Sequence, residues 1–201
     1  MLHLNAVPEP VAALLLRLSS CDALKRFALG GGTSLALRFG HRLSVDLDYF
    51  IPDEFEPGTL TDSLDLDDAT VLSIAKNSLR LLCGGVKIDL LRHAYPEVAP
   101  IEMIGVHRLL SVPDLAAMKL NAIANRGSKK DFYDLSELLQ HHTLEEMLRF
   151  FGAKYPATDP FAVIRSLAWF EDAEHEPDPI PLAGQTWDNI KQRMVHALRG
   201  L

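Results

Sequence analysis

The sequence is poor in cysteine and has no long apolar run. Its 201 residues include two cysteines, Cys21 and Cys83, with no C-x-x-C pair and no His/Cys cluster. Two isolated thiols form no disulfide framework or zinc site and are typical of a reducing cytoplasm. The apolar stretch 11–18 is interrupted by Arg17, is too short to span a membrane and follows no basic leader. We therefore expect a cytoplasmic protein without a membrane anchor.

Positive charge is also scarce. The chain has 20 Lys and Arg against 27 Asp and Glu, which gives a formal net charge of −7 at pH 7. Bulk charge therefore does not attract nucleic acid, and any RNA contact requires a local basic patch. With 48% hydrophobic and 23% charged residues and no internal repeat, the composition fits a globular chain of one domain or two small ones.

The stretch 29–50, LGGGTSLALRFGHRLSVDLDYF, concentrates the residues that indicate chemistry. Gly31 and Gly32 precede Thr33 and an apolar-rich segment that predicts the first turns of a helix. Further on, Asp46 and Asp48 alternate with apolar residues, as expected of a strand that presents both carboxylates on one face.

This order suits phosphate chemistry. A glycine run lets the backbone approach a phosphate closely, and a helix N-terminus offers free N–H groups and partial positive charge. Two adjacent carboxylates repel each other unless a cation lies between them, and Mg²⁺ commonly takes one or two carboxylates plus substrate phosphates. The stretch contains neither a G-x-x-x-x-G-K-[ST] loop nor a G-x-G-x-x-G fingerprint. The plainer alternative is a tight turn followed by two solvated aspartates at a strand end.

The following residues predict a small sheet. The segments 70–75, 79–83 and 86–91 read as strands, and Gly84-Gly85 between the last two is a hairpin signal. Asp89 lies among apolar neighbours in the third strand, where a lone carboxylate is costly unless it is paired or bound to metal. A strand-end aspartate bonded to backbone amides is the alternative. The acidic run 53–68 reads as a solvated loop with a short helix.

The remainder predicts helices, beginning with residues 8–18 before the glycine stretch and continuing at 111–125, where Ser111-Val-Pro-Asp114 has capping-box spacing. Lys119 and Arg126 lie seven residues apart, on one helix face. A second helix from Lys129 or Lys130 has Asp131 and Asp134 opposite its apolar face. Further helices are expected at 144–151, 161–170 and 187–198, with a proline-rich linker at 171–181.

These motifs resemble a known family. G-G-T-x-L followed by R-x-S-x-D-x-D is similar to the AbiEii/AbiGii toxin family of the DNA polymerase β-like nucleotidyltransferase superfamily. K-x-x-A, then R, K-D and D-L, resembles that family's second signature. The likeness is sharpest over residues 27–139. The positions that match nucleotide-binding residues of the family are Gly31, Gly32, Thr33, Arg42, Ser44, Lys119, Arg126, Lys130 and Asp131.

The resemblance implies an α/β (α+β) fold with a polymerase β-like sheet core at 1–110 and a helical region closing the cleft at 111–201. It implies that Asp46 and Asp48 bind Mg²⁺ or Mn²⁺, and that Asp89 completes a second metal site or accepts the acceptor's proton. Lys119 would meet the phosphates of an NTP, whereas Asp131 would orient a neighbouring cation. The implied protein is a toxin with a separate antitoxin, acting on tRNA or a protein hydroxyl.

Two other functions remain open on this sequence. An antibiotic-modifying nucleotidyltransferase would use the same core on a small alcohol, and the acidic run 53–68 could then receive a cationic drug. A catalytically inactive nucleotide-binding module would keep the fold without turnover.

Overall fold

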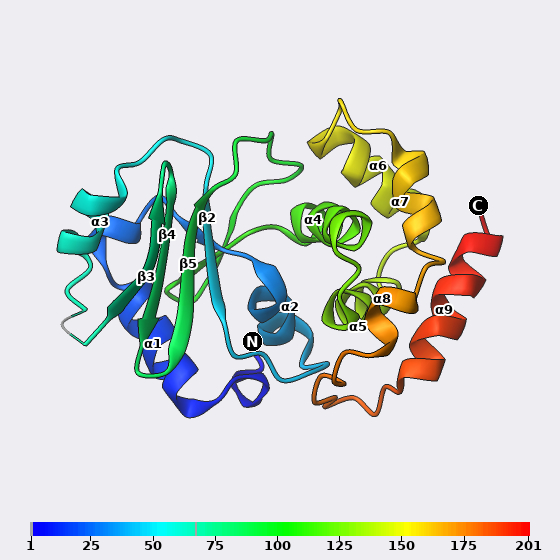
Figure 1. Cartoon of the computed structure of the whole chain (residues 1–201), viewed down its shortest axis with the longest axis horizontal. Helices are drawn as coiled ribbons and strands as arrows, with labels where there is room; N and C mark the ends of the chain where they lie inside the picture. The colour runs from blue at the N-terminus through cyan, green and yellow to red at the C-terminus, as the bar shows by residue number, and fades with distance from the viewer. Residues whose placement is uncertain (1, 67) are drawn as a thin grey trace.

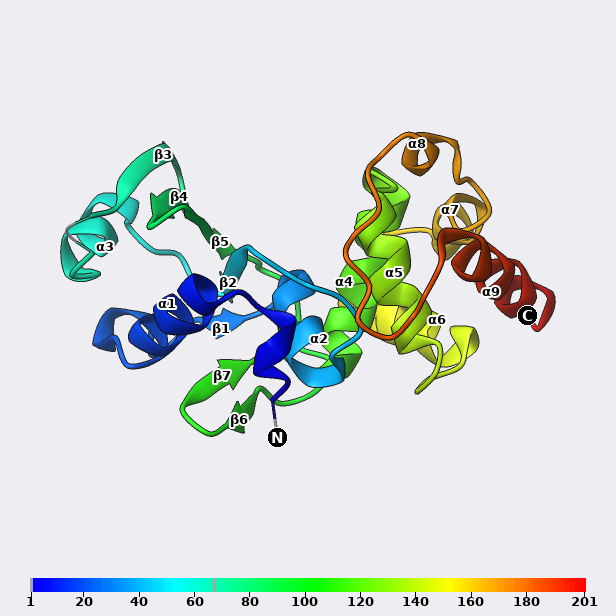
Figure 2. The ribbon, with the colours of Figure 1, turned by 90° about the horizontal axis from the view of Figure 1, so that it is seen from below.

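The computed structural model describes residues 2–66 and 68–201, which form a sheet half and a helical half (Figure 1). This mixed arrangement confirms the predicted α/β class. The helical half consists of α4 (Val112–Asn125), α5 (Lys129–Leu138), α6 (Leu144–Lys154), α7 (Pro160–Ser166), α8 (Glu171–Glu174) and α9 (Trp187–Arg199). A view from below shows the same division, with the strands on one side of α4 and the later helices on the other (Figure 2).

The sheet is mixed, as expected, and has the strand order β3-β4-β5-β2-β1-β7-β6. Its two parallel pairs are β2 with β5 and β1 with β7, and the other neighbours are antiparallel. The strands are β1 (Ala28–Leu29), β2 (Leu47–Ile51), β3 (Thr70–Ala75), β4 (Ser78–Cys83), β5 (Val86–Arg92), β6 (Glu102–Ile104) and β7 (His107–Leu109).

The three predicted neighbouring strands are confirmed to within one residue at each end. The turn between β4 and β5 is made by Gly84 and Gly85, whose φ angles are 55° and 79°. Two consecutive positive φ values define the type I′ hairpin geometry, which glycine adopts without steric cost. This turn sets the register in which Arg80 of β4 lies opposite Asp89 of β5.

Four local expectations were wrong or incomplete. The predicted linker begins with a helical turn, α8, and the preceding helix ends at Ser166 rather than continuing to Phe170. The short strands β1, β6 and β7 were not predicted, because two or three residues show no period. Asp46 immediately precedes β2 instead of lying within it. The acidic run contains α3 (Pro57–Ser63) as expected, and Asp67 of that run lies outside the described residues.

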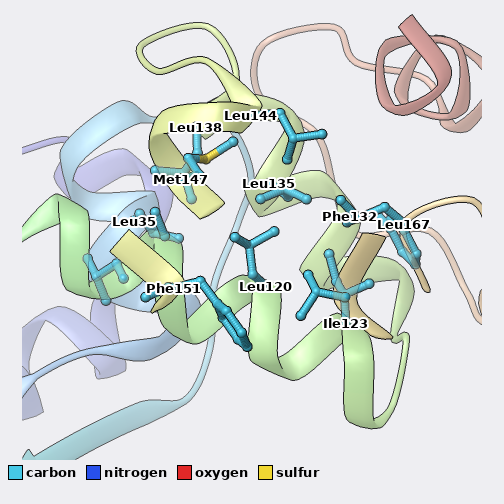
Figure 3. Close-up of a cluster of buried hydrophobic side chains, with 14 of the residues drawn as sticks. Leu35, Leu120, Ile123, Phe132, Leu135, Leu138, Leu144, Met147, Phe151 and Leu167 are labelled. Carbon is cyan, nitrogen blue, oxygen red and sulfur yellow. The ribbon is translucent and has the colours of Figure 1, made fainter. Parts of the chain in front are cut away.

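Two hydrophobic cores meet at α2 (Gly31–Phe39), the helix that the glycines open. One core packs α1 (Glu9–Ser19) against the sheet and includes Leu37 of α2. The other lies between the helices of the C-terminal half and includes Leu35 (Figure 3). Because α2 contributes to both cores, its N-terminus is fixed at the junction of the two halves.

A buried ion pair ties α6 to the start of α4. The Lys154 ammonium lies 2.6 Å from Asp114 Oδ1, and the two residues are 2% and 1% exposed. Asp114 also accepts hydrogen bonds from the Ser111 hydroxyl and the Val98 and Ala99 amides. Burial alone would raise the pKa of Asp114, but Lys154 and these hydrogen bonds outweigh it and lower that pKa.

Replacing Lys154 with Met should destabilise the fold by about 3 kcal/mol, because removal of one partner leaves a buried charge without compensation. The measurement is urea unfolding at pH 7. Lys25→Met is the matched control, since Lys25 pairs with Asp22 at the surface and its side chain is 70% exposed. That control should stay within about 0.5 kcal/mol of the parent. Equal stability of the two variants would contradict a structural role for the pair.

Candidate active site

Gly31 forms the turn from β1 into α2. Its φ of +62° lies in the left-handed region, and a Cβ at this position would overlap the carboxylate of Asp48. A Cβ on Gly32 would likewise overlap the Arg42 guanidinium. Glycine is therefore required here because the side chains from the next segment approach the backbone directly. The result is an open helix N-terminus beside an aspartate.

Asp48 faces the cleft because β2 alternates. Leu47, Tyr49 and Ile51 are buried in the sheet core, whereas Asp48 and Phe50 point to the other face. The amide of Gly30 donates to the Asp48 carbonyl at 2.8 Å, which fixes the strand against the glycine turn. Asp46 precedes the strand, and its carboxylate lies 3.9 Å from the Lys130 ammonium.

Asp89 is the neighbour of Asp48 across the parallel pair of β2 and β5. Its Oδ2 lies 2.9 Å from the Lys87 ammonium, and its Oδ1 lies 3.6 Å from Arg80 Nε. At that distance Oδ1 is buried without a hydrogen-bond partner. Asp89 is thus held by two half-exposed cations and retains an unsatisfied oxygen.

The three carboxylates influence one another. Burial raises the pKa of Asp48, Lys119 opposes that shift, and Asp89 and Asp46 add to it. A hard divalent cation would remove this repulsion, and carboxylate oxygens are its preferred ligands. Asp46 and Asp48, with the unsatisfied oxygen of Asp89, therefore fit Mg²⁺ or Mn²⁺. Within residues 2–66 and 68–201, however, no three such side chains stand close enough to enclose an ion by themselves.

Beneath these carboxylates lies a buried network centred on Asp134. Its Oδ1 accepts from His41 Nε2 and Arg42 Nε, both at 2.7 Å, and its Oδ2 lies 2.8 Å from Arg42 Nη2 and 2.6 Å from Lys119 Nζ. All four lone-pair positions are thereby occupied. Burial alone would raise the pKa of Asp134, but Arg42, Lys119 and the hydrogen bonds hold it well below the usual value.

Asp131 occupies the same layer, one helical turn before Asp134. It contacts Lys119 Nζ at 2.8 Å and is gripped by Arg126, whose Nε and Nη2 lie 2.7 and 3.0 Å from its two oxygens. Burial would raise the pKa of Asp131, and Lys119 and Arg126 overcome that effect and lower it. Burial would lower the pKa of Lys119, but Asp134 and Asp131 raise it, so this lysine remains charged.

A cleft of about 880 Å³ lies between the sheet and α4. Ten of the twelve residues predicted from sequence line it: Gly31, Gly32, Arg42, Ser44, Asp46, Asp48, Asp89, Lys119, Arg126 and Lys130. Thr33 and Asp131 lie below its surface. Thr33 is only 1% exposed. Its hydroxyl forms hydrogen bonds with the Ser44 hydroxyl, at 2.8 Å, and with the Asp46 carbonyl. Thr33 therefore fixes the segment that carries the aspartates.

One wall of the cleft was missed by the sequence reasoning. Residues 175–182, here called the strap, run back from α8 to the sheet half (Figure 2). Leu43 N donates to Ile180 O at 2.9 Å, and Leu182 N donates to His41 O at 2.8 Å. Glu176 of the strap accepts from the Ser128 hydroxyl and the Lys129 amide, both at 2.8 Å. The proline-rich composition of the strap indicated only a linker. No local sequence signal marked the hydrogen bonds between the strap and residues 41–43.

Known structures and sequences give this arrangement its class. MenT4, a nucleotidyltransferase toxin from Mycobacterium tuberculosis H37Rv, has a TM-score of 0.61 and 20% identity, covering 93% of this chain and 81% of its own. JHP933 from Helicobacter pylori has a TM-score of 0.59 and 16% identity, covering 99% and 92%. At these identities the likeness establishes the fold alone. An uncharacterised protein of Aquifex aeolicus (strain VF5) is 37% identical over 158 residues, 75% of this chain and 76% of that protein.

The chain is a nucleotidyltransferase. It belongs to the AbiEii family, described as "Nucleotidyl transferase AbiEii toxin, Type IV TA system", whose pattern matches residues 13–102 and 86–199. The resemblance drawn from the glycine and aspartate motifs is thereby confirmed.

Replacing Asp134 with Asn should destabilise the protein at pH 7 by about 3–5 kcal/mol, because Arg42 would lose its carboxylate partner in a buried site and Lys119 would keep only Asp131. The pKa of Asp134 is depressed in the folded state. Its contribution to the free energy of unfolding is therefore fully present above the unfolded-state pKa of about 3.9 and is lost as the pH falls through the folded-state pKa. The difference between parent and variant, measured by urea unfolding, should therefore shrink in acid. Asp188→Asn, an exposed control, should change stability little.

Replacing Gly31 with Ala should reduce nucleotide transfer and cost about 1–3 kcal/mol of stability, because alanine is strained at φ +62° and displaces Asp48. Gly152→Ala is the matched control. Gly152 lies in α6 with nothing within 4 Å of an added Cβ, so this change should be neutral or slightly stabilising. Thermal melts and transfer rates of both variants test the contrast. A Gly31→Ala protein as stable and active as the parent would contradict the tight approach.

Proposed function

We propose that this enzyme transfers a nucleotide from an NTP to a macromolecular acceptor, an RNA such as tRNA or a protein hydroxyl, in a reaction that requires Mg²⁺ or Mn²⁺. The observation that carries the proposal is the contact of Asp48 with the glycine turn at the N-terminus of α2. The glycine turn that would bind the phosphates is thus in direct contact with the carboxylate pair that would bind the metal ion. The family description supports a toxin that acts with an antitoxin partner.

The residues divide the work of binding the triphosphate. The N–H groups of Gly31 and Gly32 face the phosphates at the helix N-terminus. Arg126 and Lys130, whose side chains are 58% and 48% exposed, reach the outer phosphates. Lys119 has three N–H donors, of which Asp131 and Asp134 take two, so that one is left for a phosphate oxygen.

Asp46 and Asp48, with Asp89, would hold the metal ion. When bound, that ion neutralises charge that develops on the phosphates. The acceptor oxygen attacks the α-phosphorus, its bond to phosphorus forms as the bond to pyrophosphate breaks, and the hydroxyl proton is released. Asp89 either accepts that proton or contributes to a second metal site. Thr33, Asp131 and Asp134 act below the cleft by positioning these groups.

The small-molecule alternative loses its main support in the structure. The acidic run was its candidate drug-binding region, and none of its described residues, 53–66 and 68, lines the cleft. Instead, Leu60 and Leu64 of that run pack into the sheet core.

In the described part of the chain, no helix is long and apolar enough to cross a membrane. The two free cysteines, Cys21 and Cys83, support our proposal that the reaction takes place in a reducing cytoplasm.

Incubation of the purified protein with each labelled NTP, Mg²⁺ and either total RNA or total protein tests the proposal. Label should move to one macromolecular fraction and should stay in the nucleotide when EDTA is added. Transfer only to a small cationic alcohol would instead support the antibiotic-modifying function, and absence of transfer would support an inactive module.

Asp48→Asn should lower the rate of nucleotide transfer by several orders of magnitude without destabilising the metal-free fold. The folded-state pKa of Asp48 is raised, so above the unfolded pKa of about 3.9 its ionised form costs stability, and the neutral amide removes that cost. Thermal stability in EDTA at pH 7 should therefore stay level or rise. Melting curves and transfer rates are measured on the same preparations, with Asp188→Asn as control. An early-melting Asp48→Asn protein that transfers at the parent rate would sink the catalytic role of this residue.

A further inference from the structure

The two ends of the cleft differ in chemistry. Arg42, Arg126 and Lys130 line the end near the strap and the start of α5. The opposite end, near the start of α4, is lined by apolar and aromatic groups: Phe50, Leu91, His93, Leu115, Met118 and Tyr155. None of the residues predicted from sequence lies at this second end, and the roles proposed above leave it without a function.

The aromatic end is fixed to the acidic residues by the register of the sheet. Asp48 pairs with Asp89, and two residues further along the same parallel strands Phe50 pairs with Leu91. Side chains two residues apart point to the same face, about 7 Å along the strand. An apolar pair therefore lies about one ribose length beyond the carboxylates that would hold the metal ion beside the α-phosphate.

His93 extends this surface and is held in place. Its amide donates to the Ile51 carbonyl at 2.8 Å, and its Nε2 lies 3.1 Å from the Tyr155 hydroxyl. The rings of Phe50 and His93 meet edge to face at 5.8 Å between centroids. Burial, with the nearby charge of Lys154, lowers the pKa of His93 to about 4, so the imidazole is neutral at physiological pH. A neutral, oriented aromatic ring suits an uncharged planar ligand.

Basic groups occupy a different direction from the same carboxylates. Arg80 lies across the sheet from Asp89, and Lys87 precedes Asp89 on β5, with side chains 49% and 41% exposed. That solvent-open side suits the approach of a polar acceptor. The phosphates, the acceptor and the apolar end thus occupy separate directions around Asp48 and Asp89.

We propose that the apolar end of the cleft, formed by Phe50, Leu91 and His93 against α4, is the subsite that binds the nucleobase of the incoming NTP. This inference rests on the proposed function, since it takes the phosphates to lie at the glycine turn. Because the two rings stand at 73° to each other, a planar base would stack on one of them and meet the other edge to face. These contacts supply affinity that depends on the base and not on the phosphates. The half-buried Met118 of α4 closes the other side of the slot with an adaptable side chain.

The test compares an NTP with inorganic tripolyphosphate, which has the phosphates but no base. Dissociation constants are measured by calorimetry with Mg²⁺ for the parent, Phe50→Leu and His93→Ala. Because aromatic stacking on a base is a substantial contribution to affinity, each variant should bind the NTP about tenfold more weakly and tripolyphosphate as the parent does. Phe161→Leu, the same change at an exposed position on α7 outside the cleft, should alter neither constant.

Other outcomes overturn the assignment. If the parent transfers nucleotide while both variants bind the NTP with parental affinity, the subsite is wrong and the proposed function stands. Variants that raise only the KM for the acceptor would show that the apolar end binds the acceptor instead. Equal loss of NTP and tripolyphosphate affinity would show a general disturbance of the cleft. A parent that binds no NTP would overturn both proposals, and unfolding of Phe50→Leu would leave His93→Ala to decide.

Discussion

The site depends on the burial of Asp134 between two cations, Arg42 and Lys119, and the ring of His41. His41 and Arg42 come from the sheet half, on the segment that leads to the aspartate pair, and Lys119 comes from α4. A carboxylate without water must be paired, and here its partners belong to both halves of the fold. The interaction therefore specifies how the halves meet and, with that, the distance between the glycine turn and the lysine.

The sequence was sufficient to find the glycine turn and most of the charged groups that line the cleft. Glycines before a helix and alternating aspartates indicate local geometry that neighbouring residues impose. The structure has the glycine turn before α2 and Asp48 within β2, but Asp46 precedes that strand. The sequence was insufficient to separate the side chains that line the cleft from those that lie beneath it and hold the others in place. Thr33 reads as a phosphate ligand from its place after the glycines, yet its hydroxyl is used by Ser44 and by the Asp46 carbonyl. Only the packing of α2 against the following segment decides which way that hydroxyl points.

Long-range pairing limited the prediction further. The strap binds residues 41–43 through backbone hydrogen bonds between segments nearly 140 residues apart, and such bonds leave no side-chain pattern. The same holds for Asp134, whose spacing from Asp131 indicates a shared helix face but not three partners. The aromatic end was overlooked for a related reason. Phe50, Leu91 and Tyr155 read as ordinary core positions until the register of β2 and β5 brings two of them beside the carboxylates.

The charge of the cleft bears on how an acidic protein accepts a triphosphate. Six basic side chains line it (Arg42, Arg80, Lys87, Lys119, Arg126 and Lys130), against five acidic ones (Asp46, Asp48, Asp89, Glu176 and Asp178). Asp131 and Asp134 directly beneath add two more, so acidic groups outnumber basic ones by seven to six. The protein alone thus offers a polyanion little net attraction. Since screening confines electrostatics to about 8 Å at physiological salt, distant lysines do not correct the balance. A divalent cation between Asp46 and Asp48, as proposed above, would make the net charge of the cleft positive, so metal and nucleotide would bind together.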